Sequence, residues 1–218
     1  MCLITGERVT IRTLKLEDVY AMQNWGKHEE PLFFDYNFPE LKDEEIRQWY
    51  KDRTFKKNRK SFSILNENGD TIGYLTIRNI KKFKKQATLG ITLGANFVNR
   101  GYGTEALNIF LDYFFNELKM KTICLSVAKF NKRAIRCYEK NGFRKTGEYF
   151  KKLDIKTYNV LLKERHSDLI DGFAFKKGKL YCCYYKMKLS KYDYHKKRTL
   201  KNNTTNNIRK FIDFNRLI

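Results

Sequence analysis

The stretch that decides the fold is Val98-Asn99-Arg100-Gly101-Tyr102-Gly103-Thr104-Glu105-Ala106. The glycines at positions 101 and 103 have no Cβ, so backbone amides there can come close to a ligand. The helix predicted to begin at this loop adds unpaired N–H groups and the positive end of its dipole. Together these features predict an anion site, and therefore a phosphorylated cofactor.

Two common nucleotide-binding motifs do not explain this loop. Gly-x-Gly-x-x-Ala is also a permitted dinucleotide-binding pattern, which requires an acidic residue about 20 positions later at the end of the next strand. That strand is predicted at residues 122–127 and is followed by Ala128-Lys129-Phe130, without a carboxylate. A Walker A loop requires Gly-Lys-Ser/Thr, which is also missing.

A second motif narrows the interpretation. It reads Asn131-Lys132-Arg133-Ala134-Ile135-Arg136-Cys137-Tyr138-Glu139-Lys140-Asn141-Gly142-Phe143. With the glycine loop, it resembles the GNAT superfamily of N-acetyltransferases, whose loop has the pattern Gln/Arg-x-x-Gly-x-Gly/Ala. Val98 stands where that family usually has Gln or Arg. The resemblance covers about residues 9–150 and a last strand near 180–189, and is closest to the branch of ribosomal-protein N-terminal and spermidine acetyltransferases.

The resemblance implies an α/β fold with a mixed, mostly antiparallel sheet of about seven strands flanked by helices. Residue patterns place the elements independently. Alternation and turn signals predict strands, at residues 9–14, 61–65, 71–80, 86–93, 122–127, 143–150 and 180–189. Helical spacing and capping signals predict helices, at residues 17–26 and 43–57 and after each of the two motifs.

The chain is long enough for one core with an appendage. We expect an acetyltransferase domain over residues 1–190, with an insertion at 151–179 before the last strand. Residues 191–218 are basic and contain Asn202-Asn203-Thr204-Thr205-Asn206-Asn207, so they predict a mobile tail. Hydrophobic content of 42% argues for a folded protein.

Charge is unevenly distributed. The whole chain carries a formal net charge of +21, yet its first 50 residues hold six Lys/Arg against ten Asp/Glu, a net of −4. A basic body favours weak contact with nucleic acid or the ribosome, or is simply a solvated surface. In the resembling family the first two helices wall the acceptor site, so an acidic segment there suggests a cationic amine.

The expected location is the cytoplasm. No apolar run approaches the roughly 20 residues that cross a bilayer, and the first residues do not resemble a signal peptide. The five cysteines show no metal-binding spacing and are expected to be reduced thiols. We therefore expect no metal and no membrane partner. The oligomeric state is left open, with a homodimer as one option.

Acetyl-coenzyme A is the acetyl donor that the resemblance implies. It would lie between two splayed strands, with the backbone of Ile91 and Leu93 pairing with its pantetheine arm. The resemblance assigns the remaining contacts to the glycine loop and the second helix: Val98, Arg100, Gly101, Tyr102, Gly103, Thr104, Asn131 and Ala134. Ile91 and Leu93 also suit a strand core, and Asn131 also suits a helix cap.

Tyr138 aligns with a tyrosine that many family members place near the thioester sulfur. A phenol with a pKa of about 10 suits protonation of a departing thiolate. Spacing alone also fits a packed core aromatic. The amine must lose a proton before attack, for which Glu29, Glu30, Asp35 or a water relay are candidates. Arg133 and Arg136 either reach cofactor phosphates or are solvated.

None of the three histidines, His28, His166 and His195, has a paired carboxylate in the sequence, so none is predicted to be catalytic. The sequence therefore predicts transfer of an acetyl group from acetyl-coenzyme A to an amine-bearing acceptor by direct attack on the thioester. The acceptor stays open between a polyamine, a protein N-terminus and another small amine. The alternative is a nucleic-acid- or ribosome-binding module on an inactive acyltransferase fold.

Overall fold

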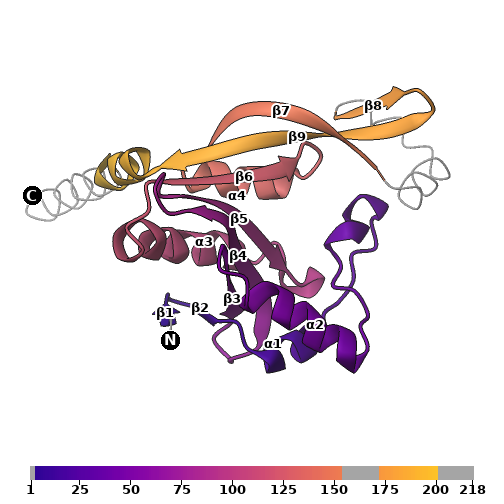
Figure 1. The fold of residues 1–218 in the computed structure, drawn as a ribbon, viewed down its shortest axis with the longest axis horizontal. Helices are drawn as coiled ribbons and strands as arrows, with labels where there is room; N and C mark the ends of the chain where they lie inside the picture. The colour runs from indigo at the N-terminus through magenta and orange to yellow at the C-terminus, as the bar shows by residue number, and fades with distance from the viewer. Residues whose placement is uncertain (1–2, 154–171, 201–218) are drawn as a thin grey trace, which may run out of the picture.

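The structure is a computed structural model that describes residues 3–153 and 172–200. Its centre is one twisted sheet in the order β1-β2-β3-β4-β5-β6-β9-β7, with β8 paired to β9 (Figure 1). The strands are β1 (Leu3–Thr5), β2 (Thr10–Thr13), β3 (Arg59–Leu65), β4 (Thr71–Lys81), β5 (Gln86–Leu93), β6 (Thr122–Ala128), β7 (Arg144–Lys152), β8 (Phe173–Lys176) and β9 (Lys179–Ser190). Only the β5–β6 pair is parallel within the described residues.

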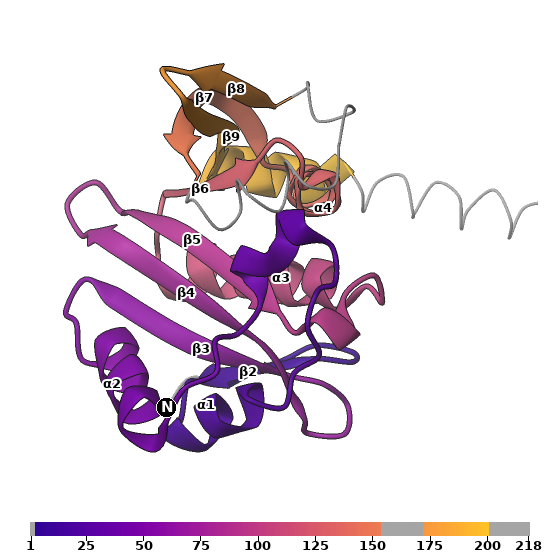
Figure 2. The same ribbon diagram turned by 90° about the vertical axis from the view of Figure 1, so that its right-hand side faces the viewer.

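Helices cover both faces of the sheet, as Figure 2 shows. The α-helices are α1 (Leu16–Met22), α2 (Asp43–Thr54), α3 (Tyr102–Asp112) and α4 (Lys132–Lys140). Short turns of other helix types are η1 (Pro31–Tyr36), η2 (Ala95–Phe97) and η3 (Tyr113–Glu117). Since α1 and α2 pack on one face and α3 and α4 on the other, the sheet carries two separate apolar layers.

The larger layer lies under α3. Its helix buries Leu107, Phe110 and Leu111 completely, at the spacing of one helical face. The smaller layer joins α1 and α2 to the sheet through Val19, Met22 and the indole of Trp25, and Trp25 Nε1 donates to the carbonyl of Thr71 at 2.7 Å. The two layers therefore hold the sheet from both sides.

The expected fold class is confirmed: the sheet is mixed and mostly antiparallel. The described residues contain nine strands rather than about seven. The two additions are β1, three residues that pair with β2, and β8, four residues that pair with the outer end of β9. Both are too short for alternation to predict them from sequence.

Two expected boundaries need correction. Of the proposed insertion at 151–179, residues 151–152 complete β7, 173–176 form β8 and 179 begins β9, while 154–171 lie outside the described residues. Of the proposed mobile tail, residues 191–200 form a helix whose Tyr194 is only 4% exposed, because its ring packs against Phe115 with centroids 5.0 Å apart. These residues belong to the fold, and 201–218 lie outside the described residues.

Candidate active site

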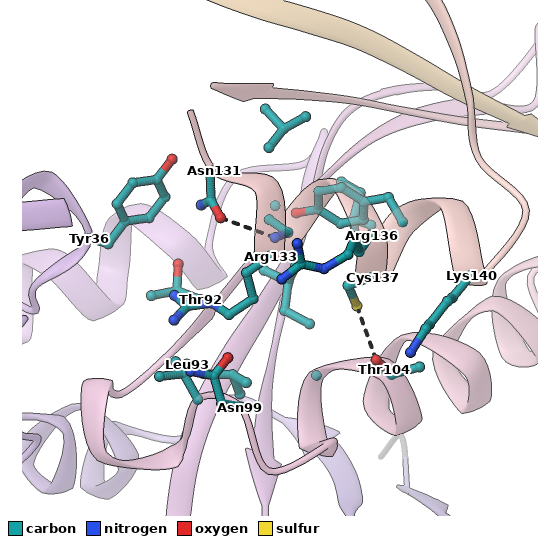
Figure 3. A pocket seen from close by; sticks show the side chains of 18 of the residues that line it. Tyr36, Thr92, Leu93, Asn99, Thr104, Asn131, Arg133, Arg136, Cys137 and Lys140 are labelled. Carbon is teal, nitrogen blue, oxygen red and sulfur yellow. Dashed lines mark hydrogen bonds between the residues drawn. The ribbon is translucent and has the colours of Figure 1, made fainter. Parts of the chain in front are cut away.

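A cavity opens where β5 and β6 separate. The two strands pair in parallel only at Gln86↔Thr122, Ala87↔Ile123 and Thr88↔Cys124. Beyond these pairs β5 stays bonded to β4 and β6 to β9, so the described part of the chain offers the facing edge of β5 no strand partner. The gap is a cavity of about 500 Å³, lined in part by Leu89, Gly90, Ile91, Thr92 and Leu93 (Figure 3).

The glycine loop forms one end of this cavity. Gly101 has a φ of +86°, a left-handed conformation that favours glycine, and its carbonyl accepts the N–H groups of Thr104 and Glu105. Tyr102 and Gly103 come before these bonded N–H groups, so the N–H groups that the first turn of α3 can offer to a ligand are theirs, and the positive end of the helix dipole faces the same way. The loop therefore has a backbone geometry compatible with the anion site predicted from its sequence.

Gly103 has an additional role in packing. A Cβ at this position would lie 3.2 Å from Cδ1 of Leu93, which is closer than ordinary contact. Glycine therefore lets the start of α3 approach β5, as well as leaving room for a ligand. A substitution at Gly103 would disturb both functions at once. At Gly101 a Cβ would lie 2.9 Å from Nη2 of Arg8, the far end of a flexible side chain, so Gly101 tests the anion site without changing the packing of α3 on β5.

The loop is held in place from the β1–β2 turn. Glu105 accepts the backbone N–H groups of Arg8 at 2.7 Å and Val9 at 3.3 Å, and its other oxygen pairs with the Arg8 guanidinium at 3.2 Å. Arg8 in turn donates to the carbonyl of Arg100 at 3.2 Å. Glu105 thus anchors the loop in addition to supplying favourable charge in the first helical turn.

Most of the residues assigned to the cofactor from sequence do line the cavity: Ile91, Leu93, Val98, Gly101, Gly103, Thr104, Asn131 and Ala134. Two do not. Tyr102 is buried and donates its hydroxyl to the carboxylate of Glu67, and Arg8 lies over its ring. Arg100 is exposed and is absent from the cavity lining. These two residues therefore contribute their backbone to the loop, and their side chains do not line the cavity.

The start of α4 forms the opposite wall. Asn131 is 4% exposed, and its Oδ1 accepts the N–H of Ala134 at 3.0 Å, which caps the helix. The same side chain lines the cavity, as does Tyr36. The capping role of Asn131 is therefore confirmed, and its place in the cavity lining is compatible with a ligand contact. Thr104 links the two helices by donating to Sγ of Cys137 at 3.5 Å.

Tyr138 lines the cavity and is 8% exposed, with its ring edge-on to Phe143 at 5.7 Å. Burial raises its pKa well above the usual value near 10, and Cys137 and Tyr36 add to that shift. The phenol therefore stays protonated at any working pH. It is a weaker acid than a free phenol, so donation of a hydrogen bond suits it better than complete transfer of its proton.

The side chains around the cavity are cationic. Arg133, Arg136 and Lys140 of α4 and Arg78 of β4 line it, and none of its described lining residues is Asp or Glu. The acidic wall expected from the first 50 residues is not found among them. Several acids of that segment pair with other residues of the segment, as in Asp18–Arg12, Glu40–Lys27 and Asp43–Arg47. Glu30 and Asp35 lie near Arg133 and Tyr36 without lining the cavity.

An aromatic cluster lies at the α4 end of the cavity. Phe33 packs edge-on against Phe130 at 5.6 Å, Phe130 stacks on Phe173 at 5.9 Å, and Tyr36 lies 5.8 Å from Phe33. His28 also packs on Phe33, and burial together with Arg133 lowers its pKa below the usual value. The four aromatic residues and His28 are called the aromatic mouth below.

Sequence reasoning missed part of this site. His28 and Tyr36 line the cavity, whereas the proposed bases Glu29, Glu30 and Asp35 are exposed and do not. The helical spacing of Arg133, Arg136 and Lys140 around Tyr138 was a usable signal for the cationic wall. No local pattern could have indicated that the η1 segment folds over the start of α4, since these segments are about 100 residues apart.

Comparisons with known proteins give the family and the fold of the chain. Residues 8–144 match the profile of the acetyltransferase (GNAT) domain family. A spermidine N(1)-acetyltransferase of Vibrio cholerae is 22% identical over 142 residues, which cover 65% of this chain and 82% of that protein. A putative ribosomal N-acetyltransferase of Bacillus subtilis is 24% identical over 155 residues, covering 66% of this chain and 81% of that protein.

Solved structures share the fold. The spermidine N-acetyltransferase of Vibrio cholerae in complex with coenzyme A and spermine superposes with a TM-score of 0.65 at 20% identity, over 87% of this chain and 99% of that one. A GNAT-family acetyltransferase of Bacillus anthracis gives a TM-score of 0.63 at 17% identity, over the same shares of the two chains. Within the described residues, every helix is too short or too polar to cross a bilayer.

Proposed function

Because the chain belongs to the acetyltransferase (GNAT) domain family, and is thus an enzyme that transfers an acetyl group to an amine, we propose that the cavity between β5 and β6 binds acetyl-coenzyme A. The observation that carries the proposal is the unpaired edge of β5 facing the first turn of α3 across one cavity. The edge offers backbone groups to an amide-rich arm, and the helix start offers N–H groups to phosphates.

The cofactor would extend from one end of the cavity to the other. Its pyrophosphate would bind Gly101, Gly103 and Thr104, with Arg136 and Lys140 available to its phosphates. Its pantetheine arm would run along Ile91 and Leu93 toward Tyr138. In Figure 3, Lys140 lies near Thr104 and far from Tyr36, which suits a cofactor entering at the loop and reacting near the aromatic mouth.

The reaction joins the amine nitrogen to the acetyl carbon, breaks the carbon–sulfur bond and releases one proton from the amine. We propose that the hydroxyl of Tyr138 donates a hydrogen bond to the leaving sulfur. Tyr138 is one of the residues that line the cavity, and the raised pKa of its hydroxyl keeps the donor proton in place. The thiolate would then gain its proton with the help of solvent at the cavity entrance.

The test is release of free coenzyme A, measured with a thiol reagent in the presence of a panel of amines. Calorimetry with acetyl-coenzyme A should show one site per chain. We expect release that depends on both the amine and the protein. A protein that binds no acetyl-coenzyme A would contradict this proposal.

We also propose a weak nucleic-acid contact on the sheet formed by β7, β8 and β9. These strands hold eight Lys/Arg against one Glu. Tyr149 and Tyr184 stack at 5.6 Å, and Lys186 lies 5.4 Å from the Tyr149 ring, an interleaving of aromatic and basic groups typical of single-strand binding.

A double variant Tyr149→Ala, Lys186→Gln should weaken binding of labelled single-stranded RNA. Its salt dependence should also become less steep, by about 0.7 in the log–log slope for each phosphate that the variant no longer neutralises. Lys82→Gln, in the β4–β5 turn, is the matched control. Equal affinity of all three proteins for RNA would remove this surface from consideration.

A further inference from the structure

We infer that the acceptor is a primary amine whose molecule also carries a carboxylate and an apolar group, as an apolar amino acid does, and that Arg133 binds the carboxylate. The inference rests on the proposed function and names the substrate class of the same site. It differs from the polyamine acceptors named for several relatives, because the charged side chains that line the cavity among the described residues are cations, whereas a polyamine requires carboxylates.

Arg133 is the first element of the argument. It lies in the first turn of α4, lines the cavity and is half-buried, with its guanidinium 5.5 Å from the ring of Phe33. Within the described residues no carboxylate lies in ion-pair distance of it, although Glu30 is near enough to act on it electrostatically. A partly desolvated guanidinium is a fixed fork of donors that suits a carboxylate.

The other cations of α4 are placed for a different partner. Arg136 and Lys140 are exposed and follow Arg133 by three and seven residues. A helix rises 1.5 Å per residue, so Lys140 lies about 10 Å along the axis from Arg133. Figure 3 places Lys140 near Thr104, at the glycine loop, and Tyr36 at the opposite side of the view. The phosphates of the cofactor can therefore pair with Arg136 and Lys140, and Arg133 is left to bind the acceptor.

The aromatic mouth supplies the apolar half of the specificity. Phe33, Phe130 and Phe173 form one continuous set of ring contacts next to the cavity, and Phe33 also lies beside Arg133. His28 and Tyr36, which pack on Phe33, are the members of the aromatic mouth that line the cavity itself. These rings contribute more binding free energy to an acceptor with an apolar side chain, which they bury away from water, than to the solvated chain of a polyamine. The acceptor would thus present its carboxylate to Arg133 and its side chain to these rings.

Charge also argues against a polyamine. The cavity is lined by four Lys/Arg, and none of its described lining residues is a carboxylate. The second ammonium group of a polyamine would lie near Arg133 and Arg78, with no carboxylate among the described lining residues to pair with it. A nearby cation instead helps a single amine, since a positive charge within a few ångströms disfavours the ammonium form and lowers the pKa of the nucleophile. The neutral amine that attacks the thioester is then more abundant at neutral pH.

The experiment compares acceptors that differ only in the carboxylate: phenylalanine against phenethylamine, leucine against isoamylamine, and spermidine as the polycation. Acetylation is followed by coenzyme A release and by mass spectrometry of the product, using the full chain. We expect kcat/KM for the amino acid to exceed that for its decarboxylated partner by about 10- to 100-fold, the range for a charge-assisted hydrogen bond. Spermidine should be the poorest acceptor.

Variants assign the preference to one side chain. Arg133→Gln should reduce the ratio between amino acid and amine to near one, by raising KM for the amino acid. Arg133→Lys, which keeps the charge but loses the fork, should retain part of it. Arg136→Gln is the matched control: it should raise KM for acetyl-coenzyme A and leave the ratio unchanged.

The outcomes separate this inference from the proposed function. Binding of acetyl-coenzyme A together with a preference for spermidine, or with equal use of phenylalanine and phenethylamine, would overturn the acceptor assignment alone. So would a ratio that survives in Arg133→Gln. If acetyl-coenzyme A does not bind at all, the proposed function fails and the acceptor assignment fails with it.

Discussion

Two arginines in this molecule stand in opposite situations. Arg12, beneath α1, makes two hydrogen bonds to the carboxylate of Asp18, at 2.8 and 2.7 Å. Asp18 also accepts from Ser63, Thr71 and the N–H of Lys15, and is 2% exposed. Arg133, at the cavity, has an aromatic ring beside it and no carboxylate in ion-pair distance among the described residues. The first site is closed by its own chain, and the second is open to a molecule from outside.

The environments of Arg12 and Arg133 distinguish a charged group that stabilises the fold from one that is available to bind a ligand. A buried carboxylate with all its bonds made by the protein serves stability, because removing one partner leaves the other buried and uncompensated. A half-buried cation with spare donors contributes little to stability until something binds it. Each prediction below tests one side of this contrast.

The largest effect is expected at the closed site. Asp18→Ala leaves the Arg12 guanidinium without its partner, so the free energy of unfolding should fall by about 3–5 kcal/mol. Urea denaturation followed by circular dichroism measures it. Asp52→Ala is the control, because Asp52 pairs with Lys56 on the surface at 3.3 Å and should cost less than about 1 kcal/mol. A loss at Asp18 no larger than at Asp52 would break the comparison.

The next effect belongs to the open site. Tyr138→Phe removes only the hydroxyl of a cavity-lining side chain and should lower kcat by roughly 10- to 1,000-fold, with the affinity for acetyl-coenzyme A almost unchanged. Tyr102→Phe is the matched control, since that hydroxyl is bonded to Glu67 away from the cavity. Turnover that is unchanged in Tyr138→Phe would return this residue to a packing role.

A smaller effect is expected at two glycines with similar backbone conformations, where a loss of stability can be separated from a loss of cofactor binding. Gly101 has a φ of +86° and Gly69 a φ of +82°. Alanine at either position should destabilise the protein by about 1–2 kcal/mol, the cost of the left-handed conformation. Only Gly101→Ala, at the loop, should also weaken the binding of acetyl-coenzyme A. Calorimetry on both variants decides the point, and equal affinities would argue against the anion site.

The smallest effect concerns pH. Burial and Arg133 lower the pKa of His28 in the folded protein below its unfolded value near 6.5. As the pH falls below about 6.5, the unfolded chain binds a proton at His28 before the folded protein does. The stability that depends on a neutral His28 is therefore fully present above pH 6.5 and is lost as the pH falls from 6.5 to the lower pKa of the folded protein. Tyr36 of η1 and Arg133 of α4 line the cavity at this site, and Glu30 and Asp35 act on Arg133 and Tyr36 in turn.

His28→Gln should therefore flatten the acid side of the stability profile slightly, and Arg133→Gln should do so in part. Thermal melting between pH 7 and pH 5 measures the slope. A steeper loss in either variant would show that Arg133 does not act on His28 as the structure indicates.

Sequence reasoning predicted the parts of this molecule that rest on local physics. The glycine loop was predicted from Gly101 and Gly103, which have no Cβ and stand at a helix start, and the cap of α4 from Asn131. It did not predict the aromatic mouth, because tertiary folding of the segment from His28 to Tyr36 brings these two residues to the cavity. It also placed acidic residues at the acceptor site by counting charge along the chain, whereas Asp18 is used to hold α1 on the sheet.

The position of β9 has a consequence for how the chain folds as it is made. β9 lies between β6 and β7, yet it follows both of them in the chain, and Tyr194 follows it into the core. Until residues 179–194 have been synthesised, β6 has an open edge and the apolar layer under α3 is incomplete. Such late, long-range pairing is slow and leaves a strand exposed to other chains. Nascent or prematurely terminated copies are therefore the forms of this protein most dependent on chaperones.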